Sequence, residues 1–141
     1  MHPDPPTPHT RVLAALISRG PHLLICQRPP HKRHGTLWEF PGGKLEAGET
    51  DADAARRELH EELGVTVTAV GQEQFAVHDE GSPFWIAFVP VEIEGDPTCL
   101  EHTALAWEPP ESLLTYALAP SDRRFVEWLL ESRARGAKQA P

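Results

Sequence analysis

The sequence is poor in cysteine and lacks a long apolar segment. Its two cysteines, Cys26 and Cys99, form no C-x-x-C pattern and no paired framework, which excludes a disulfide-stabilised scaffold and favours a reducing compartment. We expect both thiols to be buried. The first ten residues contain four prolines and no apolar signal-peptide core, so they predict a disordered tail, no membrane anchor and a cytoplasmic location.

Basic residues are also scarce. The chain has 13 Lys and Arg against 21 Asp and Glu, and its formal net charge is −8. Because extended nucleic acid is bound by neutralising many phosphates, this balance argues against such a partner. Carboxylates can still act on a phosphorylated substrate when divalent cations lie between the two. If the protein acts on nucleotides, its composition therefore predicts that it depends on a metal.

The chain has the length of one domain. With 141 residues, 40% of them hydrophobic, it can bury a core without disulfides or a structural metal. We expect this domain to span residues 11–133, between the proline-rich tail at 1–10 and a frayed C-terminal tail at 134–141. Short apolar runs predict strands at 12–18, 22–27, 37–40, 65–70, 74–77, 84–93 and 104–107. The first two strands are expected to form a hairpin, and residues 79–83 a hairpin turn.

The clearest helix is predicted between Thr50 and Leu63. Thr50 can cap its N-terminus, acidic residues occupy its first turn, and Gly64 stands where a left-handed cap would follow. Apolar residues three and four positions apart predict its buried stripe, which consists of Ala52, Ala55, Leu59 and Leu63. A second helix is expected from Ser121 to about Arg133.

A dense pattern of residues surrounds the first helix. Residues 43–65 read GKLEAGETDADAARRELHEELGV, and nine of their positions match the Nudix box, G-x5-E-x7-R-E-U-x-E-E-x-G-U, in which U is a bulky aliphatic residue. The chain therefore resembles a Nudix hydrolase, and so many matching positions are far more specific than a short glycine motif. The resemblance implies an α/β fold in which a mixed β-sheet is sandwiched between helices, an α/β/α arrangement.

The spacing of the box also has a physical meaning of its own. Glu58, Glu61 and Glu62 are three and four positions apart, so they share one helix face beside the apolar stripe. Crowded carboxylates repel one another unless a cation offsets their charge, and their oxygen atoms select Mg²⁺, for which Mn²⁺ can substitute. The alternative is an ordinary solvated acidic face, but the matching Gly43 and Arg57 favour the metal site.

The resemblance assigns a role to each matching residue. It implies metal binding by four of them, namely Gly43 through its carbonyl oxygen and Glu58, Glu61 and Glu62 through their carboxylates. Arg57 would orient a glutamate through an ion pair, and Glu49 would support this network. The alternative role for Arg57 is a weak ion pair on the helix surface. Lys44 is not a specified position of the box, but we expect its ammonium group to neutralise charge on a leaving pyrophosphate.

Segments outside the box resemble the MutT branch of the family, whose members cleave nucleoside triphosphates. Residues 37–44 read LWEFPGGK like the entry to the box in that branch. Residues 101–107, EHTALAW, and 118–122, LAPSD, resemble segments of its members that prefer cytidine nucleotides. By this match Glu101 is a further metal ligand or the base that activates water, and the alternative is a loop carboxylate.

Three further residues are candidates for substrate binding. By the resemblance Arg28 contacts the nucleotide and Asp122 reads the base. An ionised Asp122 only accepts hydrogen bonds, which suits the cytosine amine better than a purine O6, and its alternative role is to cap the last helix. Phe40 contacts the substrate, packs in the core, or does both. The basic residues 31–34 either reach the phosphates or form a solvated loop.

These observations lead to an expected function and two alternatives. We expect a Mg²⁺-dependent pyrophosphohydrolase that converts a nucleoside triphosphate into a monophosphate and pyrophosphate and removes oxidised or modified nucleotides. Its leading substrates are 8-oxo-dGTP and cytidine nucleotides. One alternative is a Nudix hydrolase of ADP-ribose or a dinucleoside polyphosphate, although the extra motifs of such enzymes are not evident. The other is a non-catalytic module that recognises damaged bases, for which an intact box is not expected. Both a monomer and a homodimer are left open.

Overall fold

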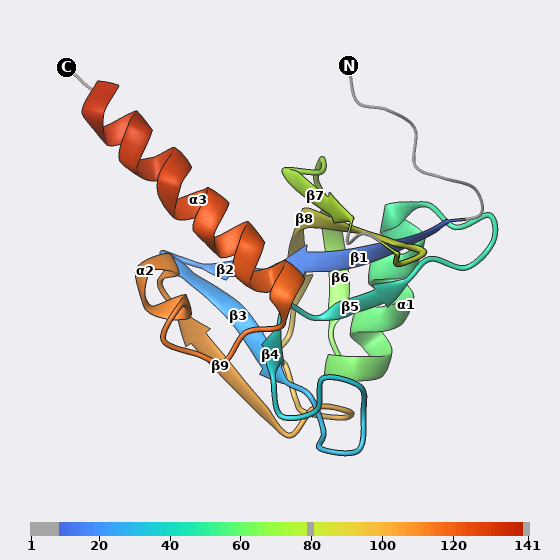
Figure 1. Ribbon diagram of the computed structural model, residues 1–141. Coiled ribbons are helices and arrows are strands. Elements are labelled where there is room, and N and C mark those ends of the chain that lie inside the picture. Colours follow the sequence, from blue (N-terminus) through green and yellow to red (C-terminus); the bar gives the residue numbers. More distant parts are fainter. Residues whose placement is uncertain (1–8, 79–80, 140–141) are drawn as a thin grey trace.

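The computed structural model describes residues 9–78 and 81–139 (Figure 1). Most of the expected N-terminal tail, part of the expected turn at 79–83 and the last two residues lie outside this description. The described residues form two β-sheets and three helices. The first strand already begins at Thr10, the last residue of the expected tail. No helix in this part of the chain is long and apolar enough to cross a membrane.

The larger sheet has five strands and is mixed. Its members are β1 (Thr10–Leu16), β5 (Gly42–Lys44), β6 (Thr66–Val70), β7 (Phe75–His78) and β8 (Phe84–Glu94). β1 runs parallel to β8 and antiparallel to β5, while β6 and β7 pair antiparallel with β8. The two parallel strands lie in the centre, where residues on both of their faces are buried and apolar. The mixed sheet predicted from the sequence is therefore confirmed.

The smaller sheet is antiparallel and has four strands. Its members are β2 (Ser18–Arg19), β3 (His22–Gln27), β4 (Trp38–Glu39) and β9 (Ala104–Glu108). β3 lies between β9 and the two short strands. Cys26 in this strand is buried as expected, but Cys99 is exposed because it lies in the irregular segment between β8 and β9.

The expected hairpin between the first two strands is mostly wrong. β1 pairs with β5 on one edge and with β8 on the other, so it offers no edge to β3. The chain instead crosses into the smaller sheet after Leu16, where Ser18 and Arg19 pair with β3 and the Ile17 carbonyl oxygen accepts a hydrogen bond from the Leu24 N–H. Gly20 makes the tight turn, because its φ of 55° lies in the region that favours glycine.

Helix α1 (Asp51–Leu63) forms as predicted and covers one face of the sheets. The Thr50 hydroxyl accepts a hydrogen bond from the Asp53 backbone N–H, and the Asp53 carboxylate accepts one from the Thr50 N–H. Gly64 ends the helix with a φ of 69°. Ala55, Leu59 and Leu63 pack into the core, whereas Ala52 is only half-buried and Ala54 is buried in its place.

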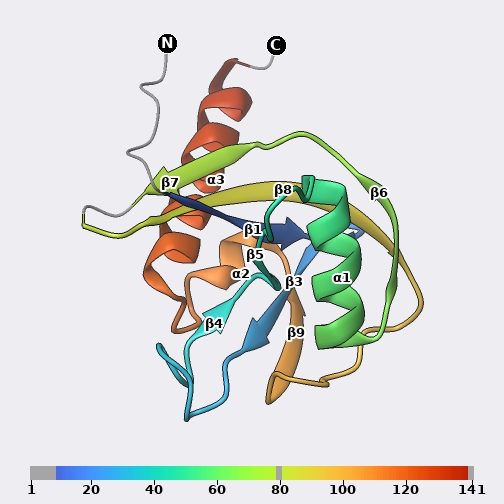
Figure 2. The ribbon, with the colours of Figure 1, turned by 90° about the vertical axis from the view of Figure 1, so that its right-hand side faces the viewer.

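Helices α2 (Pro110–Leu113) and α3 (Pro120–Gln139) cover the opposite face. Phe125 and Val126 of α3 pack against Phe88 of the central strand β8 in a second buried cluster. Figure 2 shows α1 on one side of the strands and the other two helices on the other side, so the predicted α/β/α fold is confirmed. α3 continues to Gln139, beyond the predicted end near Arg133, because residues 133–139 are mostly good helix formers.

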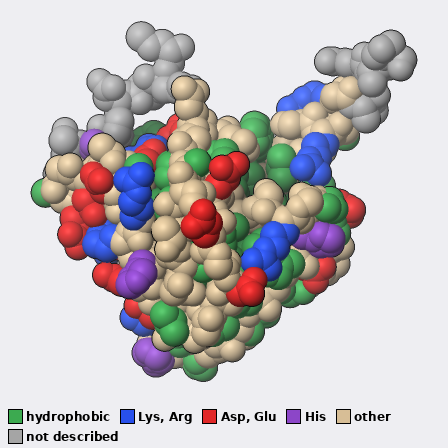
Figure 3. All heavy atoms as spheres, turned by 180° about the vertical axis from the view of Figure 1, so that it is seen from behind, with side chains coloured by type: hydrophobic (Ala, Val, Ile, Leu, Met, Phe, Trp, Pro, Cys, Tyr) green, Lys and Arg blue, Asp and Glu red, His purple; other side chains and the backbone are tan. Residues whose placement is uncertain are grey.

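The surface reflects the mixed charge of the sequence. Figure 3 shows the molecule from behind, where acidic and basic side chains lie next to one another over much of the visible face. The charges on this face are interspersed, unlike the continuous basic surface on which nucleic-acid binding depends.

Candidate active site

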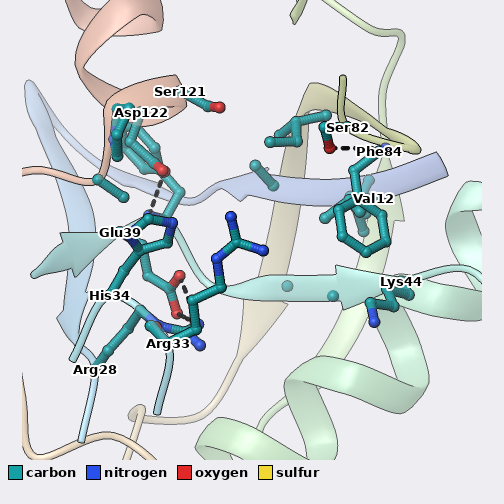
Figure 4. A pocket seen from close by; sticks show the side chains of 18 of the residues that line it. Val12, Arg28, Arg33, His34, Glu39, Lys44, Ser82, Phe84, Ser121 and Asp122 are labelled. Carbon is teal, nitrogen blue, oxygen red and sulfur yellow. Dashed lines mark hydrogen bonds and ion pairs between the residues drawn. The ribbon is translucent and has the colours of Figure 1, made fainter. Parts of the chain in front are cut away.

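A pocket of about 570 Å³ opens beside β1 and β5 (Figure 4). It is built where several parts of the chain meet: these two strands, the segment from the end of β3 to Phe40, the start of β8 and the first turn of α3. Its lining includes five of the residues predicted from the sequence, namely Arg28, Phe40, Gly43, Lys44 and Asp122. The topology thus gathers residues that are as far apart as 28 and 122 into one cavity.

Two of the α1 carboxylates lie directly behind this pocket. A Cβ atom on Gly43 would be 2.6 Å from the Glu58 carboxylate, so a side chain at this position would displace the end of Glu58. Glu62 lies one turn further along and is 4% exposed. Its burial and the neighbouring Glu58 raise the pKa of Glu62 to about 10, while the Gly42 N–H bonded to it acts in the opposite direction.

This pair of acids fits a hard divalent cation. Oε2 of Glu62 is buried and has no hydrogen-bond partner among the described residues. An unpaired buried oxygen next to a second carboxylate is costly to the fold, and a cation would offset that cost. Glu61 is exposed, and no three His, Cys, Asp or Glu side chains in the described ranges already converge on one ion position. The structure therefore brings together two of the three predicted helix ligands with the backbone of Gly43.

Arg57 holds the surroundings of this pair in place. Its Nε and Nη2 donate to the two carboxylate oxygens of Glu49 at 2.9 and 2.7 Å. Its Nη1 donates to Glu58 Oε1 at 2.8 Å, and Nη2 also donates to the Lys44 carbonyl oxygen at 3.1 Å. The guanidinium lowers the pKa of Glu49 to about 2. One arginine thus connects the loop after β5 with a candidate metal ligand.

Asp122 lies at the other end of the pocket. It is buried, and its Oδ1 accepts a hydrogen bond of 2.9 Å from the Phe40 backbone N–H. Burial raises the pKa of Asp122 to about 7, although the Phe40 N–H acts against this shift. Phe40 itself lines the pocket and also packs edge-on against Phe88 and Phe125, so it belongs to both the site and the core.

Two polar residues of the site were missed by the sequence analysis. Glu39 lines the pocket and accepts hydrogen bonds from Arg28 Nη1 at 3.0 and 3.2 Å. His102 is buried, and its Nε2 lies 2.9 Å from Glu39 and 3.8 Å from Glu62. Both residues stand inside the recognised segments LWEFPGGK and EHTALAW, but only the fold brings β4 next to the segment before β9. The neighbouring Glu101 is exposed.

Carboxylates on a helix, oriented by an arginine and placed behind a pocket that contains cationic side chains, define an enzyme that acts on a phosphorylated small molecule. Comparison with protein families agrees with this class. Residues 7–129 match the NUDIX domain, and the chain belongs to the Nudix hydrolase family. Members of this family generally depend on a divalent metal.

Named relatives cover most of the chain. It is 39% identical over 126 residues to the CTP pyrophosphohydrolase of Escherichia coli (strain K12). The aligned region covers 87% of this chain and 93% of that protein. It is 36% identical over 120 residues to a putative 8-oxo-dGTP diphosphatase 2 of Mycobacterium tuberculosis (strain ATCC 25618 / H37Rv), over 82% of this chain and 84% of the relative.

Solved structures agree with the fold. The solution structure of the E. coli ORF135 protein superposes with a TM-score of 0.76 at 38% identity, over 94% of this chain and 95% of that one. A MutT structure, from work on the proteins of Aliivibrio salmonicida and Vibrio cholerae, gives 0.74 at 31% identity, over 88% and 98%. The Nudix fold expected from the box is therefore confirmed.

Proposed function

We propose that this protein hydrolyses a nucleoside triphosphate to the monophosphate and pyrophosphate with the help of Mg²⁺. One observation carries the proposal: the half-buried Glu58 and the buried Glu62 lie behind one end of a pocket whose other end presents the buried carboxylate of Asp122. Such a site has one end for phosphates and one for a base. The relatives named as a CTP pyrophosphohydrolase and an 8-oxo-dGTP diphosphatase support the same chemistry.

At the phosphate end, the metal would be held by four residues, namely Gly43 through its carbonyl oxygen and Glu58, Glu61 and Glu62. When bound, Mg²⁺ supplies charge neutralisation for the phosphates and lowers the pKa of a coordinated water. Arg57 keeps Glu58 and the loop at Glu49 in the orientation that the site needs. Lys44 stabilises the charge that develops on the leaving pyrophosphate. Glu101 or a helix glutamate accepts the proton of the attacking water.

At the base end, Asp122 can serve two kinds of base. With a pKa of about 7, its carboxyl group is present in both forms near neutral pH. The ionised form accepts a hydrogen bond from the cytosine amine, while the protonated form can also donate one to a purine O6. An ionised Asp122 suits 8-oxoguanine less well because it cannot donate a hydrogen bond to the purine O6. At and below neutral pH the protonated form supplies this donor. We propose that the protein removes modified nucleotides of either kind from the cytoplasmic pool.

The experiment that tests this function is a substrate panel with Mg²⁺. CTP, dCTP, 8-oxo-dGTP, ADP-ribose and a dinucleoside polyphosphate are incubated with the protein, and phosphate release is measured with and without added inorganic pyrophosphatase. Pyrophosphate and monophosphate from a triphosphate are expected. Orthophosphate and diphosphate as the products would contradict the proposal. Cleavage restricted to ADP-ribose or the dinucleotide would favour the other Nudix activity, and binding without cleavage would favour a recognition module.

A further inference from the structure

The loop between β3 and β4, residues 28–37, borders the pocket and lies outside the Nudix box. Its two inward-facing arginines are used differently. Arg28 is engaged within the protein: Nη1 donates to Glu39, and Nε donates to the Arg33 carbonyl oxygen at 2.7 Å. The Arg33 side chain lines the pocket, and Figure 4 shows its guanidinium pointing into the cavity. Across residues 9–78 and 81–139, no hydrogen bond or ion pair of the structure engages this guanidinium.

The backbone of this loop is held in a conformation that side chains disfavour. His34 and Thr36 have φ angles of 57° and 69°, in the region that favours glycine. Hydrogen bonds close the loop on itself, from Thr36 N–H to the Arg28 carbonyl at 2.9 Å and from Leu37 N–H to the His34 carbonyl at 3.1 Å. Strained backbone persists only where its surroundings enforce it, and such places cluster at ligand-binding sites.

Close packing fixes the same loop further. A Cβ atom on Gly35 would lie 2.4 Å from the carbonyl oxygen of Pro30, so this position accepts only glycine. Together with the Arg28 bond to the Arg33 carbonyl, this packing fixes the direction from which Arg33 enters the pocket. A loop backbone that is fixed in advance loses no further conformational entropy when the side chain that it carries binds a ligand.

The charge of the pocket indicates which ligand Arg33 meets. A nucleoside triphosphate is strongly anionic, whereas the chain has a net charge of −8 and contributes the acids Glu39 and Asp122 to the pocket wall. A guanidinium binds phosphate through two parallel hydrogen bonds, a geometry that ammonium groups cannot reproduce. In Figure 4, Arg33 enters with Asp122 to one side of it and Lys44 to the other. Arg33 is therefore placed between the base end and the phosphate end of the pocket, where the phosphate chain of a bound nucleotide would lie.

We propose that Arg33 binds the phosphate chain of the nucleotide and that Arg28 is a positioning residue that aims it. This inference rests on the proposed triphosphate hydrolysis. Arg33 acts on substrate binding, so its loss raises KM, while the chemistry at the α1 carboxylates is left intact. Arg28 contributes to binding through the clamp that it forms on the Arg33 carbonyl.

The test compares Arg33→Ala and Arg33→Lys with Lys32→Ala. Lys32 is the matched control because it carries the same charge in the same loop, is exposed and does not line the pocket. Steady-state kinetics are measured on the best triphosphate of the panel. Dissociation constants are measured for its analogue with a methylene bridge between the α and β phosphorus atoms, and for the corresponding monophosphate and nucleoside.

Arg33→Ala is expected to raise KM and the analogue's dissociation constant roughly ten- to a hundredfold, the usual effect of losing hydrogen bonds between charged groups. Its kcat should stay within about threefold of the wild-type value. The dissociation constant of Arg33→Lys should lie between those of the wild type and Arg33→Ala. Lys32→Ala should change the dissociation constant by less than about twofold. The effect of Arg33→Ala should be absent for the nucleoside.

Two results would overturn the assignment of Arg33. If Arg33→Ala and Lys32→Ala weaken binding of the triphosphate analogue equally, the loop acts through its overall positive charge. If Arg33→Ala weakens binding of the nucleoside as much as that of the analogue, Arg33 contacts the base or the sugar. If the wild-type protein neither binds nor cleaves a triphosphate, the proposed function itself fails, which is a different outcome. For Arg28, the double variant Arg28→Ala/Arg33→Ala should bind no more weakly than Arg33→Ala alone, and additive losses would contradict the positioning role.

Discussion

The backbone N–H of Phe40 donates a 2.9 Å hydrogen bond to the carboxylate of Asp122, which lies 82 residues further along the chain. This bond joins the end of the β4 segment to the first turn of α3 and closes the base end of the pocket. It also fixes a buried acid whose pKa is about 7. The protonation of one side chain therefore changes within the physiological pH range at the place where a base would be read.

Base preference is expected to depend on pH through Asp122. Above about pH 7 the ionised carboxylate only accepts hydrogen bonds, so the ratio of kcat/KM for CTP over 8-oxo-dGTP should rise with pH. Asp122→Asn keeps a donor and an acceptor at every pH. It should shift preference toward 8-oxo-dGTP and flatten this ratio between about pH 5.5 and 8.5. A ratio that changes equally with pH in the wild type and in Asp122→Asn would contradict this role.

Removing the Asp122 side chain should lower specificity more than general hydrolysis. Each lost hydrogen bond to a charged acceptor costs about 1.5–3 kcal/mol, so Asp122→Ala should reduce kcat/KM for the preferred base roughly ten- to a hundredfold. Hydrolysis of other triphosphates should be partly retained. Equal ratios across bases in the wild type and in this variant would show that base recognition lies elsewhere.

The same residue is expected to make the fold less stable as pH rises. Its pKa is raised from 3.8 to about 7, so the folded state holds a proton that the unfolded state has already lost between these values. The stabilisation is complete below about pH 3.8 and is lost as pH rises to about 7. Asp122→Asn removes this dependence, so its free energy of unfolding relative to the wild type should increase from pH 5 to pH 8 in urea titrations. The difference is on the order of a few kcal/mol, and a constant difference would contradict the assignment.

Metal dependence is expected to show in both activity and stability. Activity should require Mg²⁺ or Mn²⁺ and disappear with a chelator, and Glu61→Gln and Glu62→Gln should each lose most turnover. Without metal, Glu62→Gln should be at least as stable as the wild type, because an amide replaces a crowded, buried acid. Added Mg²⁺ should raise the Tm of the wild type more than that of Glu62→Gln. Wild-type turnover in either variant would contradict the metal site.

The Arg57 network is expected to act through geometry rather than charge alone. Arg57 bonds both oxygens of Glu49 and one of Glu58, and a lysine cannot reproduce this fork. Arg57→Lys should therefore lower kcat roughly ten- to a hundredfold and raise the Mg²⁺ concentration needed for half-maximal activity. Arg56→Ala is the matched control, since Arg56 is the adjacent, exposed arginine of the same helix. Equal activity of the two variants would show that Arg57 is only a surface partner.

Much of the fold could be predicted because its signals are local. Thr50, Asp53 and Gly64 specify the ends of α1 from neighbouring residues alone, and the structure contains these caps. The predicted hairpin between β1 and β3 was wrong because a strand's partner depends on which strand edges are already occupied. A short segment of sequence contains no information on this. The same limit explains the site: the box spacing is local, whereas the contact of His102 with Glu39 spans 63 residues. Such a contact exists only after the two sheets are placed together.

The last prediction concerns how Lys44 is held at the pocket wall. Its Nζ lies 4.7 Å from the centre of the Phe84 ring, which favours a cation over its face. Lys44 on β5 and Phe84 on β8 come from strands on opposite edges of β1, where they pair with Val12 and Thr10. Figure 4 shows both side chains at the same end of the pocket. The ring thus favours one position of the exposed ammonium before substrate binds.

If Phe84 positions Lys44, turnover needs an aromatic ring at position 84. A tyrosine there should be tolerated because it keeps the ring and only adds a hydroxyl group. A cation–π contact contributes about 0.5–2 kcal/mol, so Phe84→Leu should lower kcat roughly two- to thirtyfold, while Phe84→Tyr retains most of it. Lys44→Ala should cost more than Phe84→Leu. Kinetics of the double variant then decide between two explanations, because a ring that acts through Lys44 adds no further loss once the lysine is gone. An additional loss in the double variant would show instead that Phe84 contacts the substrate directly.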